Sequence, residues 1–350
     1  MSYPNCNPLM RRAQANLAKR WFQVHGVDAN GRVVVRRRLW RSGVIAYFRS
    51  LEPCLVGLEA RATAHYWARE LTALGHTVKL MPPAYVKAYV KRNKNDAADA
   101  EAICEAVTRP SMRFVPIKEA EQQAVLMLHR ARSLLVRQRT MLVNALRAHL
   151  AEFGIVAPQG LRYVEILTKT IAHQQARLPE LARSILQTIV DQLNGTMARI
   201  QEIEGRLARW HRQSRVSRLL ATVPGVGIMG ASAIAATVTD PSLFRSGREF
   251  AAWLGMTPRQ NSSGGKERLG RTSKRGDKYI RSLLTAGAVA VLPHARNRPT
   301  RDGEWVRALV ARKPTKLAAV ALANKTARIV WAVMMRADGY QPREVFRQPA

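Results

Sequence analysis

Cys54-Leu55-Val56-Gly57-Leu58-Glu59 decides the fold of the N-terminal part of this chain. Its apolar residues predict a short buried strand, and the strand closes on a carboxylate. A helix is expected over about 64–74, with Gly75 as its natural end, and residues 77–81 then form another strand. The order strand, helix, strand predicts a small α/β domain.

Two further apolar runs lie upstream, at 21–27 and 32–35. They flank Asp28-Ala29-Asn30-Gly31, whose Asn-Gly pair is a strong hairpin signal. Helices over about 84–91 and 96–107 complete the domain. A hairpin followed by a strand, a helix and a strand predicts a mixed sheet with an antiparallel and a parallel part.

The helix expected from residue 96 begins with an acidic pair, in Lys94-Asn95-Asp96-Ala97-Ala98-Asp99-Ala100. Two carboxylates three residues apart lie on one helix face, and together with Glu59 they could hold a hard divalent cation for phosphodiester chemistry. The basic run 91–94 could hold a phosphate backbone beside that cation. An isolated pair of this kind is more often solvated surface, and Glu59 could instead be an edge carboxylate paired with Arg61 or Arg69.

The charge of the chain indicates a polyanionic partner. Among 350 residues, 57 Lys and Arg stand against 24 Asp and Glu, which gives a net charge of +33. Nucleic acid is the first candidate. Binding to a membrane surface is the weaker alternative, because the basic residues are spread along the whole chain and are not gathered on one amphipathic helix.

The cysteines, Cys6, Cys54 and Cys104, have no metal-like spacing, and their odd number does not favour a disulfide framework. The N-terminus carries no apolar run of signal-peptide length, and the apolar stretch 283–292 is too short to span a bilayer. These features predict a soluble protein in a reducing cytosol.

The middle of the chain is predicted to be helical. Residues 119–153 contain few helix breakers, and a second helical segment follows Pro158-Gln159-Gly160. Both segments repeat apolar residues every seven positions, which fits an antiparallel or intermolecular coiled coil as well as two core helices of a bundle. The repeats are Leu128, Leu135 and Leu142 in the first segment, and Leu186, Leu193, Ile200 and Leu207 in the second.

A third unit begins near Ser217. Thr222-Val223-Pro224-Gly225-Val226-Gly227 and the small-residue helix 228–237 are similar to a helix-hairpin-helix, in which backbone N–H groups beside Gly225 and Gly227 contact a phosphate. Such a turn is more often only a tight connection. Farther on, an apolar helix is expected over 279–292 and an amphipathic basic helix over 316–335.

A polar, glycine-rich loop over 257–266 carries Ser262 and Ser263. Serines in such loops ordinarily serve turn geometry. A serine nucleophile for DNA, however, needs an exposed hydroxyl beside basic residues that neutralise the developing phosphate charge. The candidates for that charge are Arg259, Lys266, Arg268, Lys274 and Arg275.

The order of these motifs resembles that of a known family, the insertion-sequence transposases with a RuvC-like DEDD domain and a C-terminal serine domain, also called bridge-RNA-guided recombinases. The motifs are, in order, Glu59, the acidic pair, the Pro-Gly-Val-Gly turn, the serine loop and the segment 273–277. The resemblance covers about 17–336. It implies an α/β plus all-α protein: an RNase H-like (RuvC-like) domain, a long helical coiled-coil middle, and a helical C-terminal domain with a helix-hairpin-helix. The implied divisions are an atypical segment 1–16, the RuvC-like domain 17–115, the helical linker 116–215 and the serine-loop domain 216–340.

The resemblance also implies an activity, namely DNA transposition and recombination. Glu59, Asp96 and Asp99 would bind Mg²⁺, and Ser263, with Ser262 as the alternative, would attack DNA to form a phosphoserine link. The implied partners are DNA, a structured guide RNA and further copies of the chain in a dimer or tetramer, all in the bacterial cytoplasm and without a membrane. The DNA contacts expected from the motifs are Gly225, Gly227, Arg259, Lys266, Lys274 and Arg275.

The chain departs from the family pattern at its start. Family members open with an apolar strand that holds an Asp, whereas the polar segment 8–16 places Asn16 at that position. A neutral amide binds a divalent cation more weakly than a carboxylate does. We therefore expect the first strand to be missing and a sheet edge to be exposed. The neutral Asn16 leaves open whether the chain is an active enzyme. A junction-resolvase-like metal nuclease without a covalent serine and a non-catalytic nucleic-acid-binding remnant remain as alternatives.

Overall fold

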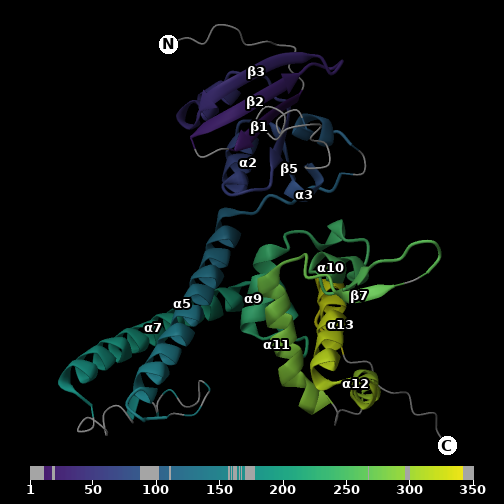
Figure 1. Ribbon diagram of the computed structural model, residues 1–350. Helices are drawn as coiled ribbons and strands as arrows, with labels where there is room; N and C mark the ends of the chain where they lie inside the picture. Colours follow the sequence, from purple (N-terminus) through teal and green to yellow (C-terminus); the bar gives the residue numbers. More distant parts are fainter. Residues whose placement is uncertain are drawn as a thin grey trace, which may run out of the picture. The chain divides into compact units, whose positions relative to one another are not determined.

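In the computed structural model the chain divides into two compact units, Met1–Gln123 and Ala124–Ala350, and each is described by itself (Figure 1). The acidic pair Asp96 and Asp99 and the basic run 91–94 lie outside the described residues. The described residues are 12–17, 20–86, 102–109, 112–156, 158, 160, 164, 166, 168, 169, 178–266, 268–295 and 300–341.

The first unit is built on a five-stranded mixed sheet with the strand order β3-β2-β1-β4-β5. β2 is antiparallel to β1 and β3, while β4 is parallel to β1 and β5, so the predicted mixed sheet is confirmed. The helices of this unit are α1 (Val44–Arg49), α2 (Ala64–Ala73) and α3 (Pro83–Val86), with a 3-10 turn η1 (Arg41–Gly43). The strands are β1 (Arg12–Leu17), β2 (Trp21–Val27), β3 (Val33–Trp40), β4 (Leu55–Glu59) and β5 (Thr77–Met81).

The hairpin between β2 and β3 is the one that the Asn-Gly signal predicted. Gly31 has φ +78°, a backbone conformation that glycine adopts without steric cost. The Asp28 carboxylate accepts hydrogen bonds from the backbone N–H groups of Asn30 (2.9 Å) and Arg32 (2.8 Å). The Asp28 side chain thus stabilises the turn.

The expectation that the first strand is missing is wrong. Residues 12–17 form β1 in the middle of the sheet, hydrogen-bonded to β2 on one side and to β4 on the other, and the expected start of the domain at residue 17 falls inside this strand. Polar and apolar residues do alternate in Arg-Ala-Gln-Ala-Asn-Leu. The strand signal is nevertheless weak, because alanine, which carries the alternation, has a low strand preference.

Helices cover one face of this sheet with a large apolar core. Phe22 of β2, Leu58 of β4, Phe48 and Trp67 belong to that core. Side chains alternate along a strand, so Gly57 and Glu59 point to the opposite face.

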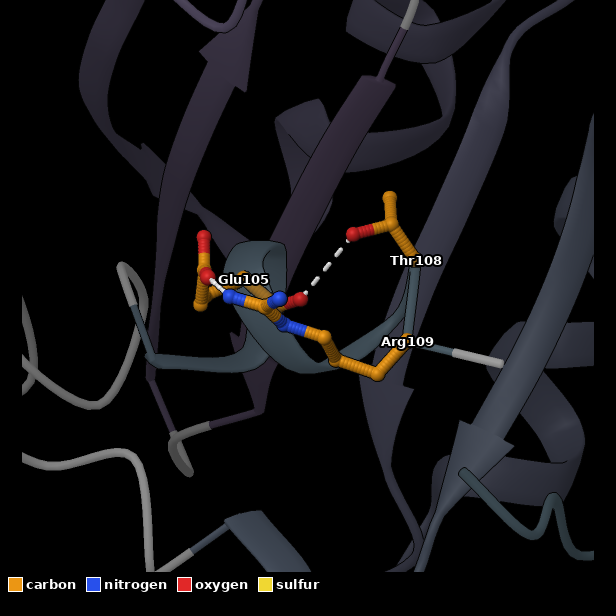
Figure 2. Close-up of polar contacts among 3 residues, drawn as sticks. All are labelled: Glu105, Thr108 and Arg109. Atoms are coloured by element: carbon orange, nitrogen blue, oxygen red, sulfur yellow. Dashed lines mark hydrogen bonds and ion pairs between the residues drawn. The ribbon is translucent and has the colours of Figure 1, made fainter. Parts of the chain in front are cut away.

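Helical residues 102–106 pack against that opposite face at Gly57. A Cβ at Gly57 would lie 3.2 Å from Ile103 Cγ2 and 3.3 Å from Val107 Cβ, so the missing side chain permits the close approach. At the end of this stretch, the Thr108 hydroxyl donates to the Glu105 carbonyl oxygen (3.1 Å) and Arg109 pairs with Glu105 (Figure 2). These contacts stabilise the last helical turn.

The second unit contains two long helices, α5 (Ala120–Ala151), which belongs to it from Ala124 onward, and α7 (Glu180–Gln213). They run in opposite directions, because the end of α5 packs with the start of α7 while Val125 packs with Leu207. Arg132 also pairs with Glu204 across the two helices (2.6 Å). The predicted heptad residues of α7 are all buried: Leu186, Leu193, Ile200 and Leu207.

The remaining helices of the second unit share one apolar core, whose members include Leu220, Phe250 and Leu284. The predicted helices near 228–237, 279–292 and 316–335 are confirmed, while α8, α10 and α12 were not predicted. The elements are α8 (Arg215–Ala221), α9 (Ile228–Thr237), η5 (Pro241–Leu243), α10 (Gly247–Trp253), β6 (Pro258–Gln260), β7 (Leu269–Thr272), α11 (Lys278–Ala295), α12 (Arg301–Arg312) and α13 (Thr315–Arg336).

Among the described residues, one helix, α13, is long and apolar enough to cross a membrane by length and composition alone. Its residues Ala323, Ala327 and Val330 are fully buried in the shared core of the second unit. A core helix passes the same test, and packing in this core accounts for the buried part of α13, 39% of its apolar stretch.

Candidate active site

Glu59 closes β4, as predicted, and is 4% exposed. Its Oε2 lies 2.7 Å from Arg61 Nε, and this ion pair reduces the cost of burying a carboxylate. Glu59 thus pairs with Arg61, one of the two partners that the sequence suggested. The expectation that Glu59 lies at a sheet edge is wrong, because β4 lies between β1 and β5. Arg69 instead donates to the Lys118 carbonyl oxygen (2.6 Å) and to Gln123 Oε1 (2.7 Å).

Asn16 occupies the neighbouring position in the sheet. β1 and β4 are parallel with Ala15 opposite Leu58, and continuing this register by one residue sets the backbone of Asn16 beside Glu59. On its other side Asn16 is opposite Gln23 of β2. The strand that the sequence predicted to be missing is thus present, and it carries a neutral amide at Asn16.

No group of three His, Cys, Asp or Glu residues in the described part of the chain is arranged to hold a metal ion. Of the three predicted ligands, only Glu59 is described. It lies on the sheet face that the helical residues 102–106 cover.

The predicted serine loop is a β-hairpin made of β6 and β7 (Figure 1). Its tip is a two-residue turn, Gly264-Gly265, with φ +57° and +76°. Both residues need positive φ, and glycine meets that need without strain. Ser263 directly precedes the turn and bridges to Lys266, whose N–H donates to the Ser263 carbonyl oxygen (3.1 Å).

The two serines differ in what their hydroxyls do. Both residues are exposed. The Ser262 Oγ accepts a hydrogen bond from the backbone N–H of Arg268 on the opposite arm (3.2 Å). Within the described residues, the Ser263 hydroxyl makes no hydrogen bond. Ser262 thus supports the hairpin, while Ser263 offers its hydroxyl to solvent.

The base of the hairpin is clamped to the end of α10. A Cβ at Gly276 would lie 2.0 Å from the Trp253 carbonyl oxygen, and one at Gly255 would lie 2.7 Å from the backbone nitrogen of Arg275. Arg281 of α11 donates to the Leu254 carbonyl oxygen (2.8 Å). The sequence did not predict these clamping residues, because they act only through contacts between separate segments.

Basic side chains lie along both arms of the hairpin and just beyond its base. Six cations in so short a segment create a strongly positive local field that favours a phosphate. All are exposed: Arg259, Lys266, Arg268, Arg271, Lys274 and Arg275.

The Pro-Gly-Val-Gly turn joins α8 to α9. Gly225 has φ +85°, and its carbonyl oxygen would lie 1.8 Å from a Cβ at Gly287 of α11, so Gly225 serves a close contact between the turn and that helix. Gly227 begins α9, is exposed, and has open space around it. A phosphate contact near Gly227 stays a prediction, and so does the helix-hairpin-helix.

A His-Ser-Tyr network, buried at His129 and Ser232 and half-buried at Tyr279, joins α5, α9 and α11. His129 Nε2 lies 3.1 Å from Ser232 Oγ, and His129 Nδ1 lies 3.1 Å from the Tyr279 hydroxyl. The Ser232 hydroxyl donates to the Ile228 carbonyl oxygen (2.7 Å), so the imidazole N–H donates to Ser232. Ser232 and His129 are both buried, which makes this pair part of the core rather than a nucleophile with its base.

Acid should destabilise the second unit through His129. Burial and the nearby Arg132 lower the pKa of His129 to about 4 from 6.5, so the unfolded chain binds the proton more tightly. Stability is therefore lost as pH falls from about 6.5 towards 4, by up to about 3 kcal/mol. Urea unfolding at several pH values should show this slope, and His129→Gln should flatten it. An unchanged slope in the variant would assign the pH dependence to other groups.

Two family models match the sequence. One, described as a DEDD transposase of the IS110 type, matches residues 17–155. The other, described as "Transposase IS116/IS110/IS902 family", matches residues 217–302. The first match contains Glu59 and the acidic pair, and the second contains the serine hairpin and its clamp.

The chain is similar over most of its length to several proteins. "Probable family 20 transposase" of Pseudomonas aeruginosa is 50% identical over 95% of this chain and 99% of its own length. "Transposase for insertion sequence element IS1328" of Yersinia enterocolitica is 40% identical over 91% of this chain and 95% of its own. "Pilin gene-inverting protein" of Moraxella bovis is 26% identical over 66% of this chain and 65% of its own.

Proposed function

The chain belongs to the IS110/IS116 family of insertion-sequence transposases, and we propose that it exchanges DNA strands with Ser263 as the nucleophile and Mg²⁺ as the cofactor. The observation that carries this proposal is the position of Ser263. Its hydroxyl stands at the tip of a hairpin whose base is clamped to α10, and cations line both arms. A nucleophile for DNA requires such exposure and such a charge.

The proposed metal site combines Glu59 with Asp96 and Asp99. Glu59 is a buried carboxylate, and such hard oxygen ligands suit Mg²⁺. Asp99 and Asp96 precede Ile103 by four and seven residues, which is the spacing of one helix face, and Ile103 packs beside Gly57 on the face that holds Glu59. When bound, the cation would neutralise charge on the phosphate and polarise it.

In the serine step, Ser263 Oγ attacks the phosphorus and forms a P–O bond while the bond to a deoxyribose oxygen breaks. The serine proton is balanced by the proton that the leaving oxygen gains as a hydroxyl. The phosphoserine keeps the phosphodiester, so a second DNA hydroxyl can reverse the step and release the serine. The name of the gene-inverting relative supports such cutting with rejoining, since an inversion joins every broken strand again.

We also propose that the chain acts as a homo-oligomer on DNA, together with a structured guide RNA. The net charge of +33 supports a large nucleic-acid partner. The division of the predicted acids and the serine between two units supports assembly, because one unit could act on DNA that another copy holds.

A metal-only nuclease is the second candidate, and the DEDD family match over residues 17–155 favours it. Water would then replace Ser263, and no covalent intermediate would form. The experiment that separates the two candidates traps the product. The chain is incubated with DNA carrying the ends of the element and Mg²⁺, denatured, and digested with protease. A DNA-linked peptide containing Ser263 supports the serine mechanism, cleavage without an adduct supports the nuclease, and binding without either outcome supports a non-catalytic remnant.

A further inference from the structure

The sheet of the first unit carries a second feature on the face of Glu59. His25 of β2 is opposite Gln14 of β1, and Gln14 is opposite Gly57 of β4. Paired residues share a face, and Glu59 follows Gly57 by two positions. His25 and Glu59 therefore belong to the same face.

Four residues of β2 and β3 share this face and form what we call the Trp-Arg face: Trp21, Arg36, Arg38 and Trp40. Trp21 is opposite Trp40, and His25 is opposite Arg36. The ring centroids of Trp21 and Trp40 lie 3.4 Å apart, and the guanidinium of Arg38 lies 4.4 Å from the Trp21 centroid.

The Trp-Arg face is open on the edge strand β3. Trp40 is 57% exposed, and Arg36 and Arg38 are exposed as well, whereas Leu39 on the other face is buried in the core. An exposed tryptophan buries little apolar surface on folding, so it adds little to stability. Beside arginines, its ring is available to stack on a ligand.

The register also aligns this face with the proposed metal site. Arg38 is opposite Gln23, Gln23 is opposite Asn16, and Asn16 lies beside Glu59, so these four residues form one row across the sheet. Three strand spacings separate the ends of the row, about 14 Å. That distance matches roughly four nucleotide-to-nucleotide steps of a stacked strand, at about 3.4 Å each.

We propose that the Trp-Arg face binds the unpaired substrate DNA strand beside the phosphate to be cut, with a base stacked on Trp40 and phosphates held by Arg36 and Arg38. The inference rests on the proposed function, which sets the cut near Glu59. Exposed aromatic rings interleaved with cations bind single strands, because every base has a ring face and every linkage a negative charge. A duplex hides its base faces, so the occupant is a single strand.

The test uses the full chain and a short single-stranded DNA that contains bromodeoxyuridine, with EDTA present so that no metal contributes. Trp40→Ala should weaken binding at least about fivefold, and Trp40→Phe should retain most of the affinity. Arg38→Ala should also lower the salt dependence by about 0.7 in slope. The matched control is Arg37→Ala on the same strand, since the Arg37 guanidinium lies 5.6 Å from the Tyr47 ring on the other face. That variant should change single-strand affinity less than Arg38→Ala.

Photo-crosslinking should link the bromodeoxyuridine to the peptide that contains residues 33–40. Crosslinks only elsewhere, or equal binding by folded Trp40→Ala, would overturn the inference. A larger loss for RNA or duplex than for single-stranded DNA would overturn it too, because another nucleic acid would then be the occupant. Binding in EDTA does not involve the serine step, so the Ser263→Ala variant should bind the strand as the wild type does. If the serine mechanism fails while Trp40-dependent binding persists, only the proposed function is refuted.

Discussion

Ser263→Ala should abolish the covalent protein-DNA link and reduce strand exchange by roughly 10⁴-fold or more, the scale on which enzymes lose activity without their nucleophilic serine. The methyl side chain of alanine cannot attack phosphorus. Both glycines of the turn remain, so the hairpin should keep its shape. Denaturing gels of labelled DNA measure the adduct, and product joints measure the exchange.

Ser262→Ala is the matched control for that experiment. It removes the hydrogen bond from the Arg268 N–H across the hairpin, at a cost of about 1 kcal/mol, but leaves the Ser263 hydroxyl in place. The adduct should therefore persist. Loss of the adduct in Ser262→Ala with its retention in Ser263→Ala would reverse the assignment. Retention of the adduct in the variant that lacks both hydroxyls would exclude a serine nucleophile at this tip.

The exposed glycine-rich loop that carries the two serines was predictable from sequence because its signals are local: two serines, two glycines and neighbouring cations. The rigidity of its support was not. It depends on Gly276 meeting the Trp253 carbonyl oxygen and on Gly255 meeting residue 275, contacts that no short-range pattern encodes. The difference between Ser262 and Ser263 likewise required the geometry of the opposite arm.

In the folds of the two units, too, elements marked by local sequence signals were predictable, and elements that depend on contacts between distant segments were not. β4, α2 and β5 were predictable because apolar runs and a stop at Gly75 mark them, and the buried stripe of α7 because it repeats every seven residues. β1 was not predictable in that way, since pairing on both sides compensates for weak strand residues. The His129 network joins residues more than 100 positions apart along the chain, beyond any local pattern.

Asn16→Asp should create a stronger cation site and raise activity. The substitution places a second carboxylate beside Glu59 in the sheet, and a carboxylate is a better ligand for Mg²⁺ than an amide. Without the cation, two adjacent carboxylates repel each other and raise the pKa of one of them. The variant should therefore unfold at a lower temperature than the wild type in EDTA and gain more from Mg²⁺, because a ligand that binds only the folded state stabilises it.

Two comparisons isolate this effect from added negative charge. Gln14→Glu puts an acid on the same strand and the same face, but opposite Gly57 rather than beside Glu59, so it should not increase the Mg²⁺-dependent stabilisation. Combining Asn16→Asp with Glu59→Gln should cancel most of the gain, because the two side chains act as one site. If Mg²⁺ stabilises the wild type as strongly as the Asn16→Asp variant, Asn16 is not a ligand position, and the family's first acid has no counterpart in β1. If only Asn16→Asp gains, the wild-type chain keeps the architecture of the metal site and lacks one charge.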